Sequence, residues 1–224
     1  MKITIAIPCY NEEKTVVDII NKVKKLKIEK EIIVVDDGST DNSYEVIKNI
    51  KGIKVFKHEK NLGKGAAVRT ALNTSTGNIF LVQDADLELD PIQIPSLIKP
   101  IINKKAEVVY GSRNIHLKKG GRSPLFYFGG LFVTFVTNVL YGIKLTDEPC
   151  GYKAFKTTVL KKLKIENDRF EWEPEITAKL AKRKIKIFEI PVTATSRSTL
   201  HGKKLKRRDG LKAIWTLIKY RFKY

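Results

Sequence analysis

The sequence is poor in cysteine and in acidic residues, and it lacks a signal-peptide core. Its 224 residues contain two cysteines, Cys9 and Cys150. They are too few for a disulfide scaffold and lack metal-ligand spacing, so we expect free thiols in a reducing cytosol. The first eight residues alternate as in a β-strand and reach Pro8 before an apolar core could form. We therefore expect a cytoplasmic protein.

The shortage of acidic residues leaves a strongly basic chain. Lys and Arg number 43 against 24 Asp and Glu, which gives a formal net charge of +19. Such a charge favours nucleic acid, phosphorylated substrates or anionic lipid, and does not choose among them. With 42% hydrophobic residues, the chain can bury a substantial core, and its length suits one large domain.

Uncharged runs are scarce, with one exception at residues 123–143. These 21 residues contain no charged side chain. A helix of this length would be just long enough to span a bilayer. Gly129, Gly130, Thr134 and Asn138 argue against a span, as does the lack of a second candidate. We expect one or two short helices lying in a membrane interface.

The C-terminal residues are both basic and amphipathic. Nine Lys or Arg fall between Lys203 and Lys223, a composition that suits an anionic membrane surface. We predict one large domain over 1–200, including a membrane-interface segment at 118–143, and a basic amphipathic helix over 201–224. One stripe of that helix is predicted to carry Leu211, Ile214, Trp215, Ile218 and Phe222.

Strand and helix patterns alternate along most of the chain, which predicts βαβ units and a mostly parallel sheet. The predicted strands are 3–7, 32–35, 54–58, 79–83 and 107–110, and the predicted helices are 12–26, 41–50, 65–73 and 91–103. Further on, the pattern favours an edge strand at 152–155, a helix at 173–183, a strand at 186–191 and a helix at 211–222.

Carboxylates gather after the predicted strands, where open parallel sheets bind their ligands. Asp84 and Asp86 lie two residues apart, so an extended segment points both the same way, and Glu88 continues the series. Hard oxygen ligands of this kind select Mg²⁺ or Mn²⁺, which typically bridge substrate phosphates. A short motif of this type alone also fits a solvated turn. Its place opposite a second acidic strand end favours the metal site.

Two further segments admit both ligand binding and local structure. Asp37 is predicted to accept hydrogen bonds from a ribose or base, and Asp36 could do the same or orient the loop. The same residues also read as a tight turn followed by a helix cap at 39–41. The segment 61–65 opens a helix, and phosphate contact and packing are equally compatible with it.

These motifs, in this order, resemble glycosyltransferase family 2, in particular the polyprenyl (dolichyl) phosphate mannose and glucose synthases. The resemblance covers nearly the whole chain. It rests on Ile-Pro-Cys-Tyr-Asn-Glu-Glu (7–13), Val-Val-Asp-Asp-Gly-Ser-Thr-Asp (34–41), Asn-Leu-Gly-Lys-Gly (61–65), Asp-Ala-Asp-Leu (84–87), Gly-Ser-Arg (111–113), Thr-Asp-Glu-Pro-Cys-Gly-Tyr-Lys-Ala-Phe (146–155), Arg-Phe-Glu-Trp-Glu-Pro-Glu-Ile (169–176) and Glu-Ile-Pro-Val (189–192).

The resemblance implies a GT-A fold, a Rossmann-like α/β sheet that binds a nucleotide-sugar, with GDP or UDP as carrier. It implies metal binding by Asp84, Asp86 and Glu88, and donor or acceptor phosphate contacts by Arg113, Arg122, Arg197 and Lys203. The donor nucleotide would contact Pro8, Tyr10, Glu12, Val35, Asp37, Asp84, Ala85, Asp86 and Lys203. Two departures stand out: Glu88 replaces a common Gln, and the apolar stretch has no arginine to accompany Arg122.

The chemistry predicts which acceptor such a site could serve. Inversion at the anomeric carbon needs an in-line nucleophile and a diphosphate leaving group whose charge is neutralised. A metal ion can supply that neutralisation. A monophosphate is mostly dianionic at pH 7 and needs cationic positioning more than proton removal. An alcohol acceptor would need a general base, for which Asp147, Glu171 and Glu173 are the candidates; all three also fit loop hydrogen bonding or a helix cap.

We therefore predict transfer of a hexose from a nucleotide-sugar to polyprenyl phosphate on the inner face of the membrane. The alternatives are a family 2 enzyme acting on a glycan or lipid hydroxyl, a nucleotidyltransferase, and a nucleic-acid-binding module. An acidic rim and a long uncharged stretch argue against the nucleic-acid-binding module. The nucleotidyltransferase is disfavoured because no glycine-rich signature follows the first strand.

Overall fold

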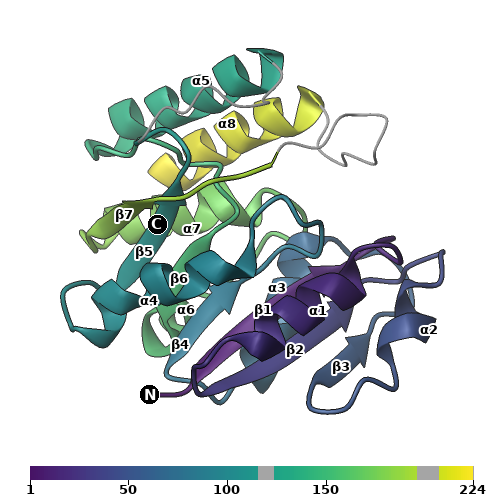
Figure 1. Ribbon diagram of the computed structural model, residues 1–224. Coiled ribbons are helices and arrows are strands. Elements are labelled where there is room, and N and C mark those ends of the chain that lie inside the picture. The colour runs from purple at the N-terminus through teal and green to yellow at the C-terminus, as the bar shows by residue number, and fades with distance from the viewer. Residues whose placement is uncertain (116–123, 196–206, 224) are drawn as a thin grey trace.

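The computed structural model describes residues 1–115, 124–195 and 207–223. A seven-stranded sheet with the order β3-β2-β1-β4-β6-β5-β7 forms the centre (Figure 1). Parallel pairing joins β1 to β2 and β4, β2 to β3, and β5 to β7, and β6 runs antiparallel to both of its neighbours. The strands are β1 Ile3–Cys9, β2 Lys30–Asp36, β3 Lys54–Lys57, β4 Ile79–Val82, β5 Val108–Ser112, β6 Lys153–Lys156 and β7 Ile187–Pro191.

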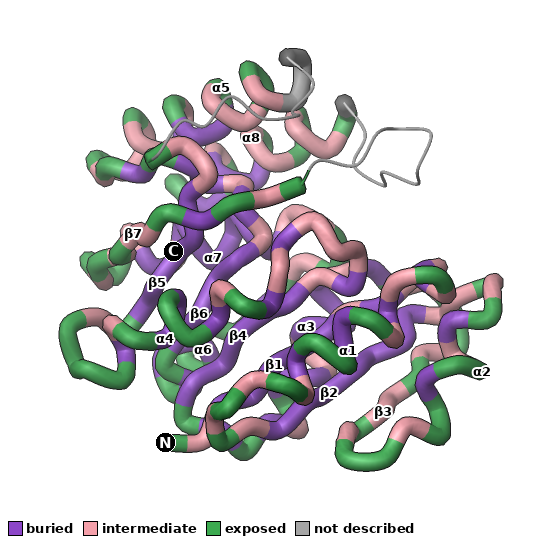
Figure 2. Tube along the Cα trace, viewed as in Figure 1, coloured by how far each residue is buried: buried purple, intermediate pink, exposed green. Residues whose placement is uncertain are grey.

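Helices cover both faces of the sheet. They are α1 Val16–Lys25, α2 Ser43–Ile47, α3 Lys64–Thr74, the short η1 Pro91–Gln93, α4 Ile94–Ile102, α5 Pro124–Tyr141, α6 Thr157–Leu163, α7 Trp172–Lys182 and α8 Arg207–Phe222. One core packs α1 and α4 against the sheet, and the other packs α3, α6 and α7. Successive residues of β1 serve different cores, as strand geometry requires: Ile5 and Ile7 join the first and Ala6 the second. The central strands are accordingly buried almost throughout, whereas β3 and β7, at the two edges of the sheet, are intermediate or exposed (Figure 2).

The predicted edge strand at 152–155 is wrong in its position. β6 lies inside the sheet, between β4 and β5. Its brevity and its lysines are typical of an edge strand, but Lys153 is fully buried. The buried ammonium is tolerated because it donates to the carbonyl oxygens of Glu148 (2.7 Å) and Cys150 (2.8 Å). The helix α6, directly after β6, has no counterpart among the predicted elements.

The uncharged stretch forms one continuous helix, α5, where one or two were expected. It lies beside α8, and both lie on the same side of the molecule, at the top of Figure 1. Val133, Ala178, Leu217 and Tyr220 form a small core shared by α5, α7 and α8. Over the residues that the structure describes, none of the helices has the length and apolarity needed to cross a membrane.

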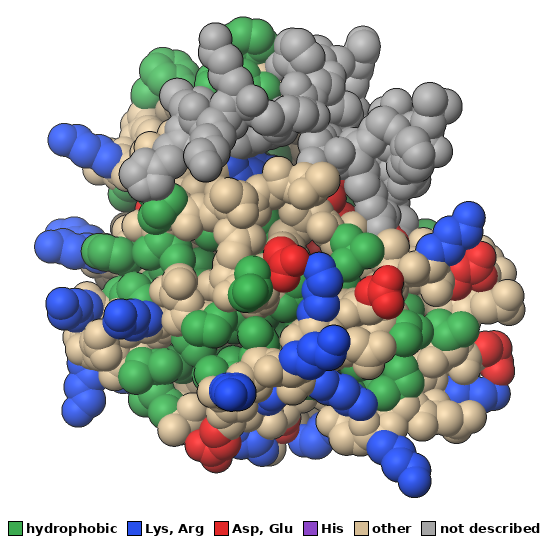
Figure 3. Space-filling view, in the orientation of Figure 1, with side chains coloured by type: hydrophobic (Ala, Val, Ile, Leu, Met, Phe, Trp, Pro, Cys, Tyr) green, Lys and Arg blue, Asp and Glu red, His purple; other side chains and the backbone are tan. Residues whose placement is uncertain are grey.

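The stripe predicted on the last helix is divided in the structure. Ile214 packs toward α5, with the Val133 core, whereas Leu211, Trp215 and Phe222 are exposed. On α5, the exposed positions Phe128, Phe132, Phe135 and Val139 have the spacing of one helical face. In Figure 3 hydrophobic side chains are visible at the top of the molecule, where α5 lies.

Candidate active site

The carboxyl ends of β1, β2 and β4 lie side by side because these strands are adjacent and parallel. Asp84 follows β4 at this edge of the sheet. Its Oδ1 lies 2.7 Å from the ammonium of Lys64, the first residue of α3. The same ammonium lies 2.9 Å from Oε1 of Glu173, in the first turn of α7. Three elements distant in sequence thus meet at the first Asp of the acidic motif.

The rest of the acidic motif forms a tight turn. The amide of Glu88 donates to Oδ1 of Asp86 (3.1 Å), and Leu87 between them has a φ of 58°. A non-glycine residue in the left-handed region is uncommon, and such strain clusters at functional sites. The turn is held from outside, since the amide of Thr195 donates to the Glu88 carbonyl (2.8 Å).

Arg113 follows β5 and is fixed by Asp147. The Asp147 carboxylate accepts from the Arg113 amide (2.9 Å), from Nε (2.6 Å) and from Nη2 (2.7 Å). Burial disfavours a charged guanidinium, but the hydrogen bonds that Arg113 donates to the Asp147 carboxylate outweigh it and raise the pKa of Arg113 above its ordinary value. The arginine predicted to meet a phosphate is therefore held charged and in one orientation.

The predicted nucleoside residue Asp37 is engaged by the protein itself. Its carboxylate accepts from the amides of Leu62 (3.0 Å) and Gly63 (2.7 Å) and from the Asn61 side chain (3.0 Å), and it pairs with Nδ1 of His58 (2.7 Å). These bonds attach the loop that leads into α3 to Asp37, directly after β2. A contact to a nucleoside remains a prediction. Among the buried side-chain oxygens of the described residues, Oδ1 of Asp36 is the one without a hydrogen bond.

The other residues predicted to contact the nucleotide-sugar lie along the same edge of the sheet. Pro8, the last residue but one of β1, pairs with Val35 of β2, and Tyr10 directly after the strand is half-buried. Val35 is fully buried among apolar side chains, and its contact with a nucleotide remains a prediction. The Glu12 carboxylate accepts from the Thr15 hydroxyl (2.7 Å), and Ala85 is buried beside the acidic turn.

Arg122, Arg197 and Lys203 lie outside the described residues. Their predicted phosphate contacts remain predictions.

Residues 4–164 match the model of glycosyl transferase family 2. The chain belongs to glycosyl transferase family 2. A UDP-N-acetylglucosamine–dolichyl-phosphate N-acetylglucosaminyltransferase of Methanococcus voltae is 33% identical over 212 residues, 85% of this chain and 84% of that protein. A dolichol-phosphate mannosyltransferase of Pyrococcus furiosus is 28% identical over 235 residues, 98% of this chain and 64% of that protein.

Solved structures confirm the GT-A fold of this family 2 chain. The glucosyl-3-phosphoglycerate synthase of Mycobacterium tuberculosis, in complex with Mn²⁺, UDP and phosphoglyceric acid, superposes with a TM-score of 0.75 at 21% identity, over 99% of this chain and 78% of that one. The mannosyl-3-phosphoglycerate synthase of Rubrobacter xylanophilus gives 0.76 at 16% identity, over 98% and 72%. Both predictions, the family and the mostly parallel GT-A sheet, are confirmed.

The acidic turn of this family 2 enzyme suits a divalent ion only with help from a substrate. Among the described residues, no three His, Cys, Asp or Glu side chains are grouped to hold a metal. Mg²⁺ is commonly bound by one or two carboxylates together with substrate phosphates. Asp84 and Asp86 supply hard oxygen donors in that number, so the residues present fit an ion that arrives with a diphosphate.

All three base candidates are paired with a cation. Asp147 holds Arg113, Glu171 lies 3.3 Å from the ammonium of Lys212, and Glu173 lies near Lys64 and Lys153. Burial raises the pKa of the Glu173 carboxyl, but the two lysines outweigh it and bring it below the ordinary value. Such a carboxylate is a weak proton acceptor at neutral pH.

The sequence reasoning missed Lys64, Lys153 and Gly151 as single residues of the site. Lys64 carries a signal that could have revealed it: a lysine at the first position of a helix opposes the helix dipole. Burial opposes the charged ammonium, yet the carboxylates of Asp84 and Glu173 raise the pKa of Lys64 above its ordinary value. A β-carbon at Gly151 would lie 2.4 Å from Oδ2 of Asp84.

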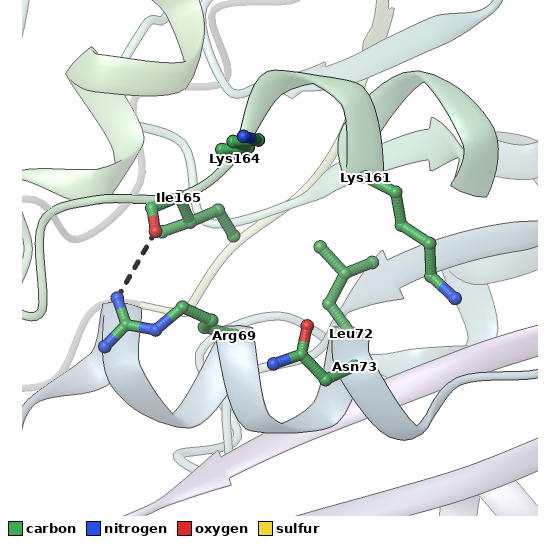
Figure 4. A pocket seen from close by; sticks show the side chains of 6 residues that line it. All are labelled: Arg69, Leu72, Asn73, Lys161, Lys164 and Ile165. Carbon is green, nitrogen blue, oxygen red and sulfur yellow. Dashed lines mark hydrogen bonds between the residues drawn. The ribbon is translucent and has the colours of Figure 1, made fainter.

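A separate depression lies at the other end of α3. It is about 350 Å³ in volume and is lined by basic and apolar side chains (Figure 4). Arg69 reaches across it to donate to the Ile165 carbonyl (3.3 Å). The acidic turn contributes nothing to it, and it plays no part in the candidate active site. Its lining is Arg69, Leu72, Asn73, Lys161, Lys164 and Ile165.

Proposed function

We propose that this family 2 glycosyltransferase transfers a hexose from a nucleoside-diphosphate sugar to polyprenyl (dolichyl) phosphate, with inversion, at the cytoplasmic surface of a membrane. The names of the relatives from Methanococcus and Pyrococcus, both dolichyl-phosphate sugar transferases, support the acceptor. The sugar and the base of the donor are left open between GDP- and UDP-linked hexoses.

The observation that carries the proposal is the position of the turn 147–151. On one side this turn binds Arg113 through Asp147 and packs Gly151 against Asp84. On the other side it contacts α5: the amide of Glu148 donates to the Thr134 hydroxyl (3.1 Å). A single turn thus connects the phosphate-binding arginine and the acidic motif to the helix with the exposed apolar face. A lipid phosphate needs this combination.

The proposed reaction is a direct displacement. An oxygen of the acceptor phosphate forms a bond to the anomeric carbon while the bond to the donor diphosphate breaks, and the nucleoside diphosphate leaves. Mn²⁺ or Mg²⁺ held by Asp84 and Asp86, with Glu88 as the third candidate, would neutralise the leaving diphosphate. Arg113 orients a phosphate through its fixed guanidinium. The pairing of all three carboxylates with cations favours this phosphate acceptor over an alcohol.

The surface of α5 and α8 is proposed to lie on the membrane. α5 contributes the exposed Phe132, and α8 contributes the exposed Trp215 together with the exposed basic residues Lys212 and Lys219. Amphipathic helices of this composition lie in the headgroup region of anionic membranes. Binding to nucleic acid is not expected.

The deciding experiment is a donor panel. GDP-mannose, UDP-glucose and UDP-N-acetylglucosamine, each radiolabelled, are offered with a polyprenyl phosphate and Mn²⁺, and the organic phase is counted. We expect one donor to label the lipid fraction in a metal-dependent manner. Label that reaches a free prenol or a glycan but never the prenyl phosphate would contradict the proposed acceptor.

A further inference from the structure

Four charged residues form a row from β6 to the acidic turn. Lys153 lies 3.5 Å from Oε2 of Glu173, Glu173 lies 2.9 Å from Lys64, and Lys64 lies 2.7 Å from Oδ1 of Asp84. The charges alternate, and the side chains of Lys153, Glu173 and Lys64 are at most 13% exposed. Both Glu173 oxygens face an ammonium, so Glu173 anchors Lys64 and Lys153 anchors Glu173.

The Asp84 carboxylate is held on its other side as well. A β-carbon at Gly151 would lie 2.4 Å from Oδ2 of Asp84, a separation that real contacts do not show. This oxygen therefore rests against the Gly151 backbone while Lys64 holds Oδ1. Rotation of the carboxylate would break the ion pair on one side and meet the backbone on the other.

Local structure does not explain a lysine at position 64. It begins α3, whose first turn contains no acidic residue, and the helix dipole disfavours a cation there. A buried ammonium is also costly unless it is paired. Lys64 violates these local preferences and is compensated by distant carboxylates, one of which, Asp84, belongs to the candidate site; a functional role is the expected reason for such an exception.

We propose that Lys64 is a positioning residue for the donor site: it holds the Asp84 carboxylate in its binding orientation, with Glu173 and Lys153 as its anchors and Gly151 as the opposite wall. This inference rests on the proposed function, since it assumes that Asp84 serves a metal-bound nucleoside diphosphate. It assigns Glu173 to positioning instead of proton removal.

The test measures binding, without acceptor or turnover. Affinity of the full-length protein for UDP and for GDP is measured calorimetrically with Mn²⁺ and with EDTA, and the thermal unfolding midpoint is recorded for each variant. Loss of a residue that orients a metal ligand typically weakens metal affinity 10- to 100-fold. We expect Lys64→Met to weaken Mn²⁺-dependent nucleotide binding by about tenfold or more, and Lys64→Arg to restore part of it.

Lys179 offers a matched control. Its side chain is 14% exposed, against 13% for Lys64, and it also bridges two carboxylates, Glu166 and Glu175. Lys179→Met should lower the unfolding midpoint as much as Lys64→Met while leaving Mn²⁺-dependent binding within about twofold of wild type. Equal nucleotide affinities for the two methionine variants would overturn the positioning role.

A glycine pair tests the opposite wall independently. Gly151→Ala should displace Asp84 and weaken Mn²⁺-dependent binding, whereas Gly129→Ala, whose new methyl group meets no atom within 4 Å, should not. Unchanged binding in Gly151→Ala would count against the inference even if Lys64→Met failed to fold. A wild-type protein that binds neither nucleotide with Mn²⁺ would contradict the proposed function itself, and this inference with it.

Discussion

Arg113 and Asp147 are joined by three hydrogen bonds, one from the backbone amide and two from the guanidinium, all between 2.6 and 2.9 Å. Bidentate pairs of this kind fix the plane of the arginine. Taking a proton would cost Asp147 its pairing with a buried cation, which is strongly unfavourable. Asp147 therefore acts through Arg113, and removing its charge should affect phosphate binding.

The first prediction separates a phosphate acceptor from an alcohol. Glu171→Gln should lower kcat only modestly, and Asp147→Asn should mainly raise KM for the acceptor, as loss of Arg113 orientation would. Arg122→Ala and Arg197→Ala should be far more damaging. Steady-state kinetics with polyprenyl phosphate measure these effects. If one carboxylate variant instead lost about 10² to 10⁴ in kcat, the usual contribution of a general base, with both arginine variants near normal, the acceptor would be a hydroxyl.

The second prediction concerns the metal. Asp86→Asn should reduce transfer by about 10²-fold or more, because it removes a ligand for the ion at the leaving diphosphate. The unfolding midpoint should change little, since Asp86 is only half-buried and its turn keeps the Glu88 and Thr195 amide bonds. Asp84→Asn should be equally inactive but less stable, because Lys64 loses a partner. Full activity in EDTA would refute the metal assignment.

The third prediction concerns the surface of α5 and α8. Phe132→Ser and Trp215→Ser should each weaken co-sedimentation with anionic vesicles by about tenfold, which corresponds to roughly 1.4 kcal/mol of lost apolar burial. Ile92→Ser, at a position 74% exposed in η1, provides a control of similar exposure. Raising the salt concentration should also weaken attachment, since basic residues contribute to it. Equal retention of all three variants would mean that a different surface meets the membrane.

The fourth prediction is a pH dependence of stability at Glu31 in β2. Burial raises the pKa of this carboxyl, but hydrogen bonds from Thr4, Thr76 and Lys54 outweigh it and lower the pKa from 4.5 to about 2. A folded-state pKa below the unfolded value stabilises the fold above pH 4.5, and this contribution is lost as the pH falls toward 2. At pH 7 we expect Glu31→Gln to cost on the order of 2 kcal/mol.

Denaturant titrations at pH 7 and pH 2.5 check this prediction. The difference between wild type and Glu31→Gln should shrink at the lower pH, because the carboxyl of the unfolded chain is then protonated and folding must ionise it. Glu29, two residues away, is a control: its side chain is 68% exposed, so Glu29→Gln should change stability little at either pH. A constant difference across the two conditions would show that Glu31 acts through packing and not through its charge.

Much of the fold is predictable from local pattern. The alternation of apolar strands and amphipathic helices identifies β1 to β5 and their helices, and the acidic strand ends identify the edge where Asp84 and Asp86 lie. The position of β6 is not predictable in this way, because nothing in residues 152–155 shows which strands they pair with. Lys153 looks like a surface lysine until Glu173 and two carbonyl oxygens are placed beside it.

Single side chains of the site were harder to predict than its location. Sequence indicates that Asp37 is a polar residue after a strand, and only the fold shows four protein donors around its carboxylate. The partners of Glu173 lie 109 and 20 residues away in the chain, so its charge environment depends on tertiary structure. Long-range ion pairs are the feature that periodicity and spacing do not encode.

The antiparallel placement of β6 has a consequence for how such an enzyme can diversify. β5 and β6 are neighbouring antiparallel strands, so the segment between Ser112 and Lys153 is one long insertion in the connection between them. That segment contains α5, its exposed aromatic face and the turn that holds Arg113. Insertions or deletions within it need not alter the register of any strand. The part of the chain proposed to meet the acceptor can therefore change in length and character while the half proposed to bind the nucleotide is inherited intact.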